Sequence, residues 1–264
     1  SLTAAAAGST GGAGYIPPGT ELEYSFEIRD NSGAVFRTPG QVFLYSDNRF
    51  KWQSVSSGLI TVYYYGEYVE ERARTVLKAA EEAFDIMVPV LGIETTEPLR
   101  IVSYNNYRHM AAALPFRSQA VRENLQTQGM AFTSERVLLV HGFDPTVRGT
   151  VSHEFVHLLV AEAAAEGYSM VPAWLNEGLA EFGNIDPTDD YDSALRYGIF
   201  TRRIKPLWFQ TSFSGSTDDI IIAYGQARSV VGYLISRYGE DSIPKLFRAV
   251  RTSLNIDAAL EQVY

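Results

Sequence analysis

The sequence contains no cysteine, which excludes a disulfide scaffold, a thiolate metal site and a cysteine nucleophile. It has only four histidines, so any metal site must combine a few imidazoles with carboxylates. No apolar run approaches the roughly 18 residues that a membrane-spanning helix needs. Basic residues are also scarce, with 22 Lys and Arg against 31 Asp and Glu and a net charge of −9. We therefore expect neither nucleic acid nor anionic lipid as a partner.

What the chain does contain is the composition of a globular protein. Apolar residues make up 46% of its 264 residues and charged residues 20%, which argues against disorder. At roughly 150 residues per domain, this length predicts one or two domains with a substantial core. The chain begins at Ser1 without an initiator methionine or a basic-then-apolar leader. We expect a processed or excised fragment, with an extracytoplasmic or cell-surface location favoured and the oligomeric state left open.

Composition divides the chain into three segments. Residues 1–14 are small and of low complexity, which predicts a flexible tail or linker. Residues 15–52 have the alternation and the turn residues of short β-strands. Residues 53–264 mix strand and helix patterns and become almost entirely helical toward the end. They predict an α+β domain with a small mixed sheet and a mostly helical C-terminal half.

The segment 15–52 is predicted to form a hairpin that continues as a meander. Apolar and polar residues alternate over 21–28, turn residues follow at 30–33, and short strands are expected over 34–38 and 41–45. Three strands are too few for an independent sandwich. We therefore expect part of an immunoglobulin- or fibronectin-like module.

Hydrophobic periodicity predicts the elements of the larger segment. One helical repeat ends at Gly92, a typical stop. A later helix is expected to begin with Asp144 as its N-cap and Pro145 in its first turn, and to stop at Gly167. The expected strands are 59–65, 99–104, 129–132 and 136–141, and the expected helices are 69–91, 107–114, 145–166, 173–182, 217–238, 240–251 and 255–264.

The predicted helix 145–166 carries the motif His153-Glu154-Phe155-Val156-His157. Residues i and i+4 lie on one face of a helix, so both imidazoles can reach the same ion while Glu154 projects beside it. Zinc takes imidazole nitrogens at about 2.0–2.1 Å, and a catalytic zinc site needs a third protein ligand and a position for water. The motif therefore predicts His153 and His157 as two ligands of a metal site.

A candidate for the third ligand follows twenty residues after His157. The segment Asn176-Glu177-Gly178-Leu179-Ala180-Glu181 lies on the predicted helix 173–182, and a helix–turn–helix unit of this length can bring Glu177 back over the histidine pair. Glu181 lies one turn further along. Its carboxylate could accept the free ring N–H of a metal-bound histidine and raise that ligand's basicity. The alternative is a solvated pair of glutamates on an amphipathic helix.

With both motifs in view, the chain resembles the gluzincin metallopeptidases of clan MA. HEFVH followed by NEGLAE is similar to thermolysin-type and aminopeptidase N-type enzymes, and in element order 59–264 resembles bacterial peptidase MA-like domains. The resemblance implies a zincin-like, thermolysin-like fold and a zinc metallopeptidase that acts on peptide or protein substrates. It also implies one zinc ion per chain, bound by His153, His157 and Glu177, with Glu181 behind the ligands.

The resemblance further implies that Glu154 is the general base. It would take a proton from a zinc-activated water as that water attacks the carbonyl, and return it to the leaving amine. Tyr224, in Ala223-Tyr224-Gly225-Gln226-Ala227-Arg228, resembles the transition-state tyrosine of aminopeptidase N-type enzymes. We expect it to open a helix and to donate to the oxyanion, the alternative being an ordinary tyrosine. Arg228 is a candidate for binding a substrate carboxylate, although a surface arginine is favoured.

One stretch departs from the aminopeptidase pattern. Those enzymes carry an acidic residue on an upstream strand that holds the substrate's amino group, whereas residues 128–133 here read QGMAFT and contain no carboxylate. An exposed edge strand could still bind an extended peptide through its backbone. The departure therefore favours internal or nonstandard substrates over free N-termini.

Two other classes of function remain open. The chain could be a catalytically silent zincin scaffold used for binding, but a structural zinc has no use for a general base such as Glu154. It could also be a cell-surface binding module to which the peptidase unit is incidental. The remaining histidines, His109 and His141, are expected to be ordinary core or surface residues.

Overall fold

The computed structural model describes residues 15–115, 128–210 and 212–264, and the predicted tail 1–14 lies outside these ranges. Its centre is a five-stranded mixed sheet, in which three inner strands are parallel and the two outer strands run antiparallel to their neighbours. The order across the sheet is β5 (Trp52–Ser57), β6 (Ile60–Tyr65), β7 (Leu99–Tyr104), β9 (Val137–His141) and β8 (Gly129–Phe132).

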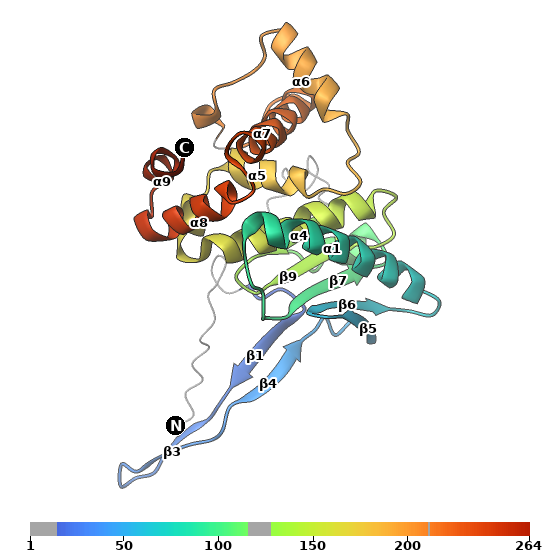
Figure 1. Cartoon of the computed structure of the whole chain (residues 1–264). Helices are drawn as coiled ribbons and strands as arrows, with labels where there is room; N and C mark the ends of the chain where they lie inside the picture. The colour runs from blue at the N-terminus through green and yellow to red at the C-terminus, as the bar shows by residue number, and fades with distance from the viewer. Residues whose placement is uncertain (1–14, 116–127, 211) are drawn as a thin grey trace.

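Two long helices cover one face of this sheet. Helix α1 (Glu70–Leu91) packs against α4 (Val147–Ala164), and both lie over the strands (Figure 1). Small residues on α1, among them Ala73 and Ala83, are completely buried and let the two helices approach closely. The short helix α2 (Tyr107–Ala111) lies with an aromatic cluster built around Tyr104.

The C-terminal half is helical, as predicted. A 3₁₀ helix (Ala165–Met170) leads from α4 into the next helices, which gather on the side of α4 away from the sheet (Figure 1). These helices are α5 (Ala173–Phe182), α6 (Tyr191–Phe200), α7 (Thr217–Tyr238), α8 (Ser242–Ser253) and α9 (Ile256–Val263), with a further 3₁₀ turn over Leu207–Phe209. The predicted fold class, α+β with a small mixed sheet, is confirmed.

Several predicted boundaries are confirmed to the residue, and one strand and one α-helix were missed. The bounds of β7, β8, α5 and α7 match the sequence prediction. Strand β5 was missed because Trp52 and Val55 are its only large apolar residues, as suits an edge strand. Helix α6 was missed because only Tyr191 and Gly198 of its ten residues are buried.

The predicted start and stop of α4 are wrong by about two residues. The Asp144 side chain accepts hydrogen bonds from the backbone N–H and the hydroxyl of Thr146, so it caps a turn that precedes the helix. The helix itself begins at Val147. It ends before Gly167 because Ala165 has a φ of 47°, which breaks the α-helical path.

The N-terminal strands form one long two-stranded ribbon, so the predicted meander is wrong. Strand β1 (Thr20–Tyr24) pairs with β4 (Gln41–Tyr45), and β2 (Glu27–Arg29) pairs with β3 (Val35–Arg37) inside it. The chain therefore reverses only once, at the turn after Arg29. The ribbon projects from the sheet (Figure 1). Whether it is part of a larger β module, and whether a boundary falls near Trp52, stay predictions.

Candidate metal centre

Helix α4 places two imidazoles one above the other. His153 and His157 are four residues apart in an unbroken stretch of helix, and their Nε2 atoms lie 3.2 Å apart with the rings nearly perpendicular. Apolar neighbours surround them on the helix, including the fully buried Phe155 and Val156. The helix therefore presents two nitrogen donors to one point in a largely dry environment.

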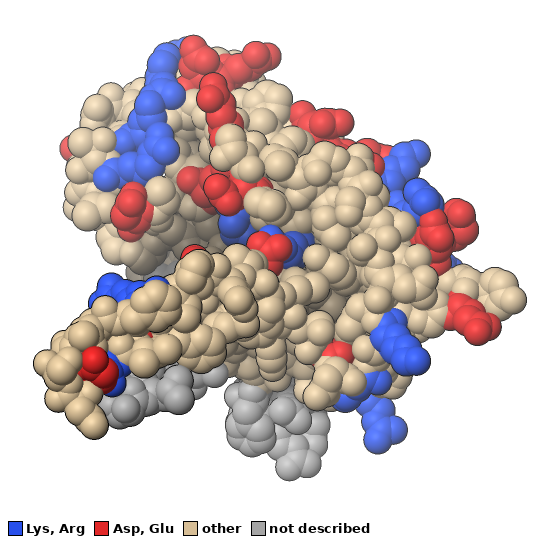
Figure 2. All heavy atoms as spheres, turned by 90° about the horizontal axis from the view of Figure 1, so that it is seen from below, with Lys and Arg blue, Asp and Glu red and all other residues tan. Residues whose placement is uncertain are grey.

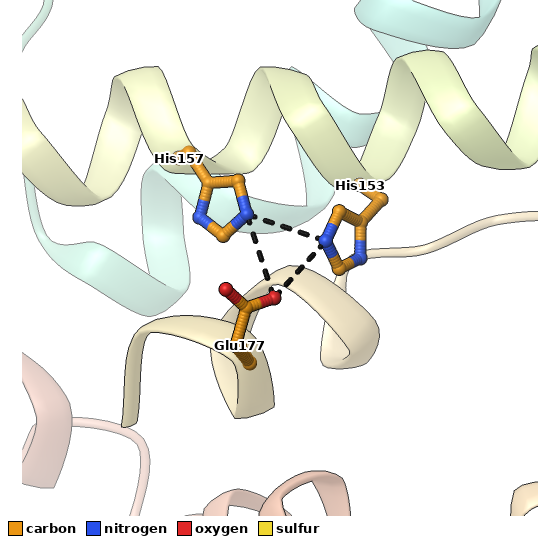
Figure 3. A group of neighbouring side chains, drawn as sticks. All are labelled: His153, His157 and Glu177. Carbon is orange, nitrogen blue, oxygen red and sulfur yellow. Dashed lines mark hydrogen bonds and ion pairs between the residues drawn. The ribbon is translucent and has the colours of Figure 1, made fainter. Parts of the chain in front are cut away.

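Helix α5 supplies the third donor from across the site. Oε2 of Glu177 lies 3.2 Å from Nε2 of His153 and 3.6 Å from Nε2 of His157 (Figure 3). Three ligands around a tetrahedral zinc, with bonds of about 2.0–2.1 Å, are expected to lie about 3.3 Å apart. The three donor atoms have this spacing, so the group could hold one metal ion.

The environment of Glu177 fits a cation between these side chains. Its Oε2 atom is buried and receives no hydrogen bond of acceptable geometry among the described residues. Leaving a carboxylate oxygen buried without a partner is costly. An ion held by the same oxygen and the two imidazoles would remove that cost, so the residues present fit a divalent metal.

Without an ion, the protonated imidazole of His153 and the carboxylate of Glu177 stabilise each other's charge. Burial alone would lower the pKa of His153, but the carboxylates of Glu177 and Glu181 beside the ring raise that pKa to about 10. Burial would raise the pKa of Glu177, but His153 and His157 hold it below its usual value. A proton on His153 thus takes the place of positive charge that a metal would bring.

Glu181 orients His153 from behind. Its Oε1 atom lies 2.9 Å from Nδ1 of His153, the ring nitrogen that faces away from the donor triangle. The other oxygen accepts a hydrogen bond of 3.0 Å from the side-chain amide of Asn184. Glu181 is only 4% exposed, so the solvated-pair alternative does not describe it.

Asn176 orients the second histidine, a contact that the sequence reading did not identify. Its Oδ1 atom lies 3.0 Å from Nδ1 of His157, and its amide nitrogen lies 3.4 Å from the hydroxyl of Tyr168. Each of the two histidines thus has a polar side chain beside the ring nitrogen that faces away from the donor triangle. The signal was present in the sequence, because Asn176 directly precedes Glu177 on the same helix.

Glu154 points toward the edge of the sheet. Its Oε2 atom accepts a hydrogen bond of 3.1 Å from the backbone N–H of Ala131 in β8. Strand β8 pairs with β9 on one side only among the described residues. The carboxylate of Glu154, the residue that follows His153 on α4, therefore contacts the backbone of an edge strand.

Tyr224 also reaches the site, but from within a helix. It lies two turns inside α7, so it does not open a helix, and its place agrees instead with the predicted helix 217–238. Its ring centre is 5.9 Å from that of His153, and its hydroxyl lies near the carboxylate of Glu177. Burial and the nearby carboxylates raise its pKa, which keeps the hydroxyl protonated.

Close packing of α5 on α7 brings Tyr224 to this position. A Cβ added to Gly178 of α5 would lie 2.6 Å from the carbonyl oxygen of Ala227 in α7. Only glycine permits this approach of the two backbones. The glycine of the NEGLAE segment thus helps to place a residue more than forty positions later in the chain.

The model of one protein family matches most of the chain. Residues 79–264 match the peptidase MA superfamily. The chain belongs to the peptidase MA superfamily. The match begins inside α1 and leaves out the ribbon and strands β5 and β6. No curated protein matches the chain.

The remaining candidates lie outside the centre of the peptidase MA domain. Arg228 is exposed and forms an ion pair of 3.5 Å with Asp192. His109 bonds through Nδ1 to the hydroxyl of Tyr65, and His141 lies at the end of β9. These placements agree with the ordinary roles expected for all three. Among the described residues, no helix is both long and apolar enough to span a bilayer.

Proposed function

We propose that this member of the peptidase MA superfamily is a zinc-dependent peptidase. The observation that carries the proposal is the triangle formed by Nε2 of His153, Nε2 of His157 and Oε2 of Glu177, whose sides measure 3.2 to 3.6 Å. Two imidazoles and one carboxylate form a zinc set that leaves a fourth position open for substrate or water. The family includes inactive members, so the assignment also depends on the residues around this triangle.

We propose Glu154 as the general base, and its place on α4 between His153 and His157 supports this role. A zinc ion bound at this site would supply Lewis-acid chemistry, polarising the scissile carbonyl and lowering the pKa of a water molecule. Glu154 would take a proton from the attacking water as the water oxygen bonds to the carbonyl carbon, and would return that proton to the leaving nitrogen as the C–N bond breaks. The products are a carboxylic acid and an amine, which balances the hydrolysis.

Tyr224 would stabilise the charge that develops on the carbonyl oxygen. Its raised pKa keeps it a hydrogen-bond donor, and its ring lies beside His153. A neutral hydroxyl aimed at a developing oxyanion stabilises the transition state more than the ground state. The hydroxyl, which lies near Glu177 in the structure, would then donate its hydrogen bond to the substrate.

The substrate we propose is an extended peptide cleaved at an internal bond. Strand β8 lies beside Glu154 and can offer backbone groups to a peptide. Residues 128–133, which include this strand, contain no acidic side chain that could bind a substrate's terminal amine. Internal or nonstandard substrates are therefore favoured over free N-termini.

Metal analysis combined with cleavage of an unbiased peptide library tests this function. Purified protein should contain one zinc per chain and should cleave library peptides, while the matched variant Glu154→Gln should keep the zinc and lose most of the cleavage. Zinc binding without cleavage by the wild-type protein would indicate a silent scaffold. A fully loaded preparation without any divalent transition metal would overturn the proposal.

A further inference from the structure

The projecting ribbon has one face that is almost entirely apolar, which we call the aromatic face. Leu22 lies opposite Phe43 in the β1–β4 pair, and Ile28 lies opposite Phe36 in the β2–β3 pair. Ring contacts of Tyr24 link the two halves. The aromatic face consists of Leu22, Tyr24, Phe26, Ile28, Phe36, Phe43 and Tyr45.

The opposite face of the ribbon carries its charges. Glu27 lies opposite Arg37 and forms ion pairs of 2.6 Å with Arg29 and 2.8 Å with Arg37. Glu23 lies opposite Val42 on the same side. Successive residues of a strand point to opposite faces, so this separation follows directly from the sequence alternation. The ribbon is therefore amphipathic, with one face suited to water and one that is not.

The aromatic face is exposed to an extent that calls for a partner. Six of its seven residues are 39% to 61% exposed. In the view from below, few charged side chains lie along the projecting ribbon (Figure 2). A large aromatic side chain has about 150–250 Å² of surface that it can bury. At these exposed fractions, the six residues together leave on the order of 600 Å² in contact with water. Patches of this size mark interaction sites, and an isolated two-stranded hairpin is only marginally stable in water. No described part of the chain covers this face.

We propose that the aromatic face binds the same face of a second copy of this chain, forming a twofold dimer. Such an interface uses one patch on both subunits, so the patch must be complementary to itself. A face without charged side chains meets this condition even though each chain carries a net charge of −9. Two copies would bury about 1,200 Å² in total, the lower end for a specific interface. The charged faces would remain in water.

Sedimentation equilibrium of the purified full chain tests this proposal. The matched pair is Phe36→Ser on the aromatic face and Val42→Ser on the charged face, because these residues are 61% and 63% exposed. The wild-type protein should dimerise reversibly. Phe36→Ser should weaken the dimer by roughly 10²-fold, since the change occurs in both copies, and Val42→Ser should have little effect. Equal dimerisation of the two variants would overturn the proposal.

The absence of native cysteine allows a second measurement that keeps every residue of the aromatic face. Gln41→Cys and Val42→Cys place one thiol on opposite sides of β4, and Gln41, which lies opposite Tyr24, is on the side of the aromatic face. Under mild oxidation, Gln41→Cys should form a covalent dimer at low protein concentration and Val42→Cys should not. Equal cross-linking of both variants would indicate random collision and would overturn the proposal. A monomer at every concentration would also overturn the proposal, and so would a monomer that binds neutral phosphatidylcholine vesicles through this face.

Discussion

Oδ1 of Asn176 lies 3.0 Å from Nδ1 of His157, on the side of the ring that faces away from Glu177. The residue that supports one candidate ligand therefore directly precedes another candidate ligand in the sequence. Because both lie on α5, a single helix determines the position of the carboxylate and the orientation of the imidazole. Displacement of α5 would disturb two donors together.

Replacing Asn176 by Ala should weaken metal binding without removing a ligand. Loss of such an outer partner typically costs about 10- to 100-fold in metal affinity. Competition with a chromophoric chelator would measure the change. Asn184→Ala is a useful comparison, because Asn184 supports Glu181 and stands one step further from a ligand. An unchanged affinity in Asn176→Ala would show that this hydrogen bond has no role in metal binding.

Glu177 and Glu154 should respond differently to removal of their carboxylates. Glu177→Ala should lose the metal, because it deletes a donor that faces both imidazoles. Glu154→Gln should retain the metal and lower the rate by roughly 10² to 10⁴ through loss of proton transfer. Elemental analysis and turnover on the same samples make the comparison. If both variants keep metal equally well, the assignment of the third ligand is wrong.

Metal binding should release a proton, and pH should affect the metal-free protein in a specific direction. The pKa of His153 is raised from 6.5 to about 10, so its contribution to stability is complete below pH 6.5 and is lost as the pH rises toward 10. The melting temperature of chelated protein should fall over this interval. Zinc should raise the melting temperature, because it binds only the folded state.

Calorimetric titration in two buffers of different ionisation enthalpy would count the released proton. Near neutral pH we expect about one proton per metal, since His153 must be neutral to bind. Titration of the same protein near pH 10 provides the control, because release should be smaller there. Metal binding without proton release at neutral pH would contradict the charge sharing described for His153 and Glu177.

Tyr224→Phe should lower kcat while KM hardly changes. The hydroxyl would act only in the transition state, and losing one such donor costs about 3 to 4 kcal/mol, or roughly 10² to 10³ in rate, less where a metal shares the charge. Metal content should stay unchanged because the ring remains. An ordinary tyrosine predicts a lower melting temperature with near-normal turnover, so a turnover within about twofold of wild type would refute the role.

Acetylating the N-terminus of a good peptide substrate should leave its cleavage largely intact. Residues 128–133, beside Glu154, contain no carboxylate to bind a free amine. Comparing blocked and free forms of the same peptide measures this directly. Cleavage restricted to free N-termini would mean that a residue outside this stretch anchors the amine.

Local patterns in the sequence determined most helices and strands and the two histidine ligands of the candidate metal centre. The spacing of His153 and His157 is enough to bring their rings together, because a helix returns to the same face after four residues. Apolar periodicity likewise predicted the bounds of α5 and α7. These are short-range effects, so the chain on either side hardly alters them.

Only the tertiary structure decided how distant residues meet. Twenty residues separate Glu177 from His157, and nothing local sets the distance between them. Packing of α5 on α4 brings Glu177 within 3.2 Å of His153, and the contact of Gly178 with Ala227 brings Tyr224 over the same point. In the ribbon, the sequence predicted the alternation of apolar and polar residues along each strand, but it did not predict which strands pair. Pairing depends on which strand the turn brings alongside, and that is a long-range choice made by the whole chain.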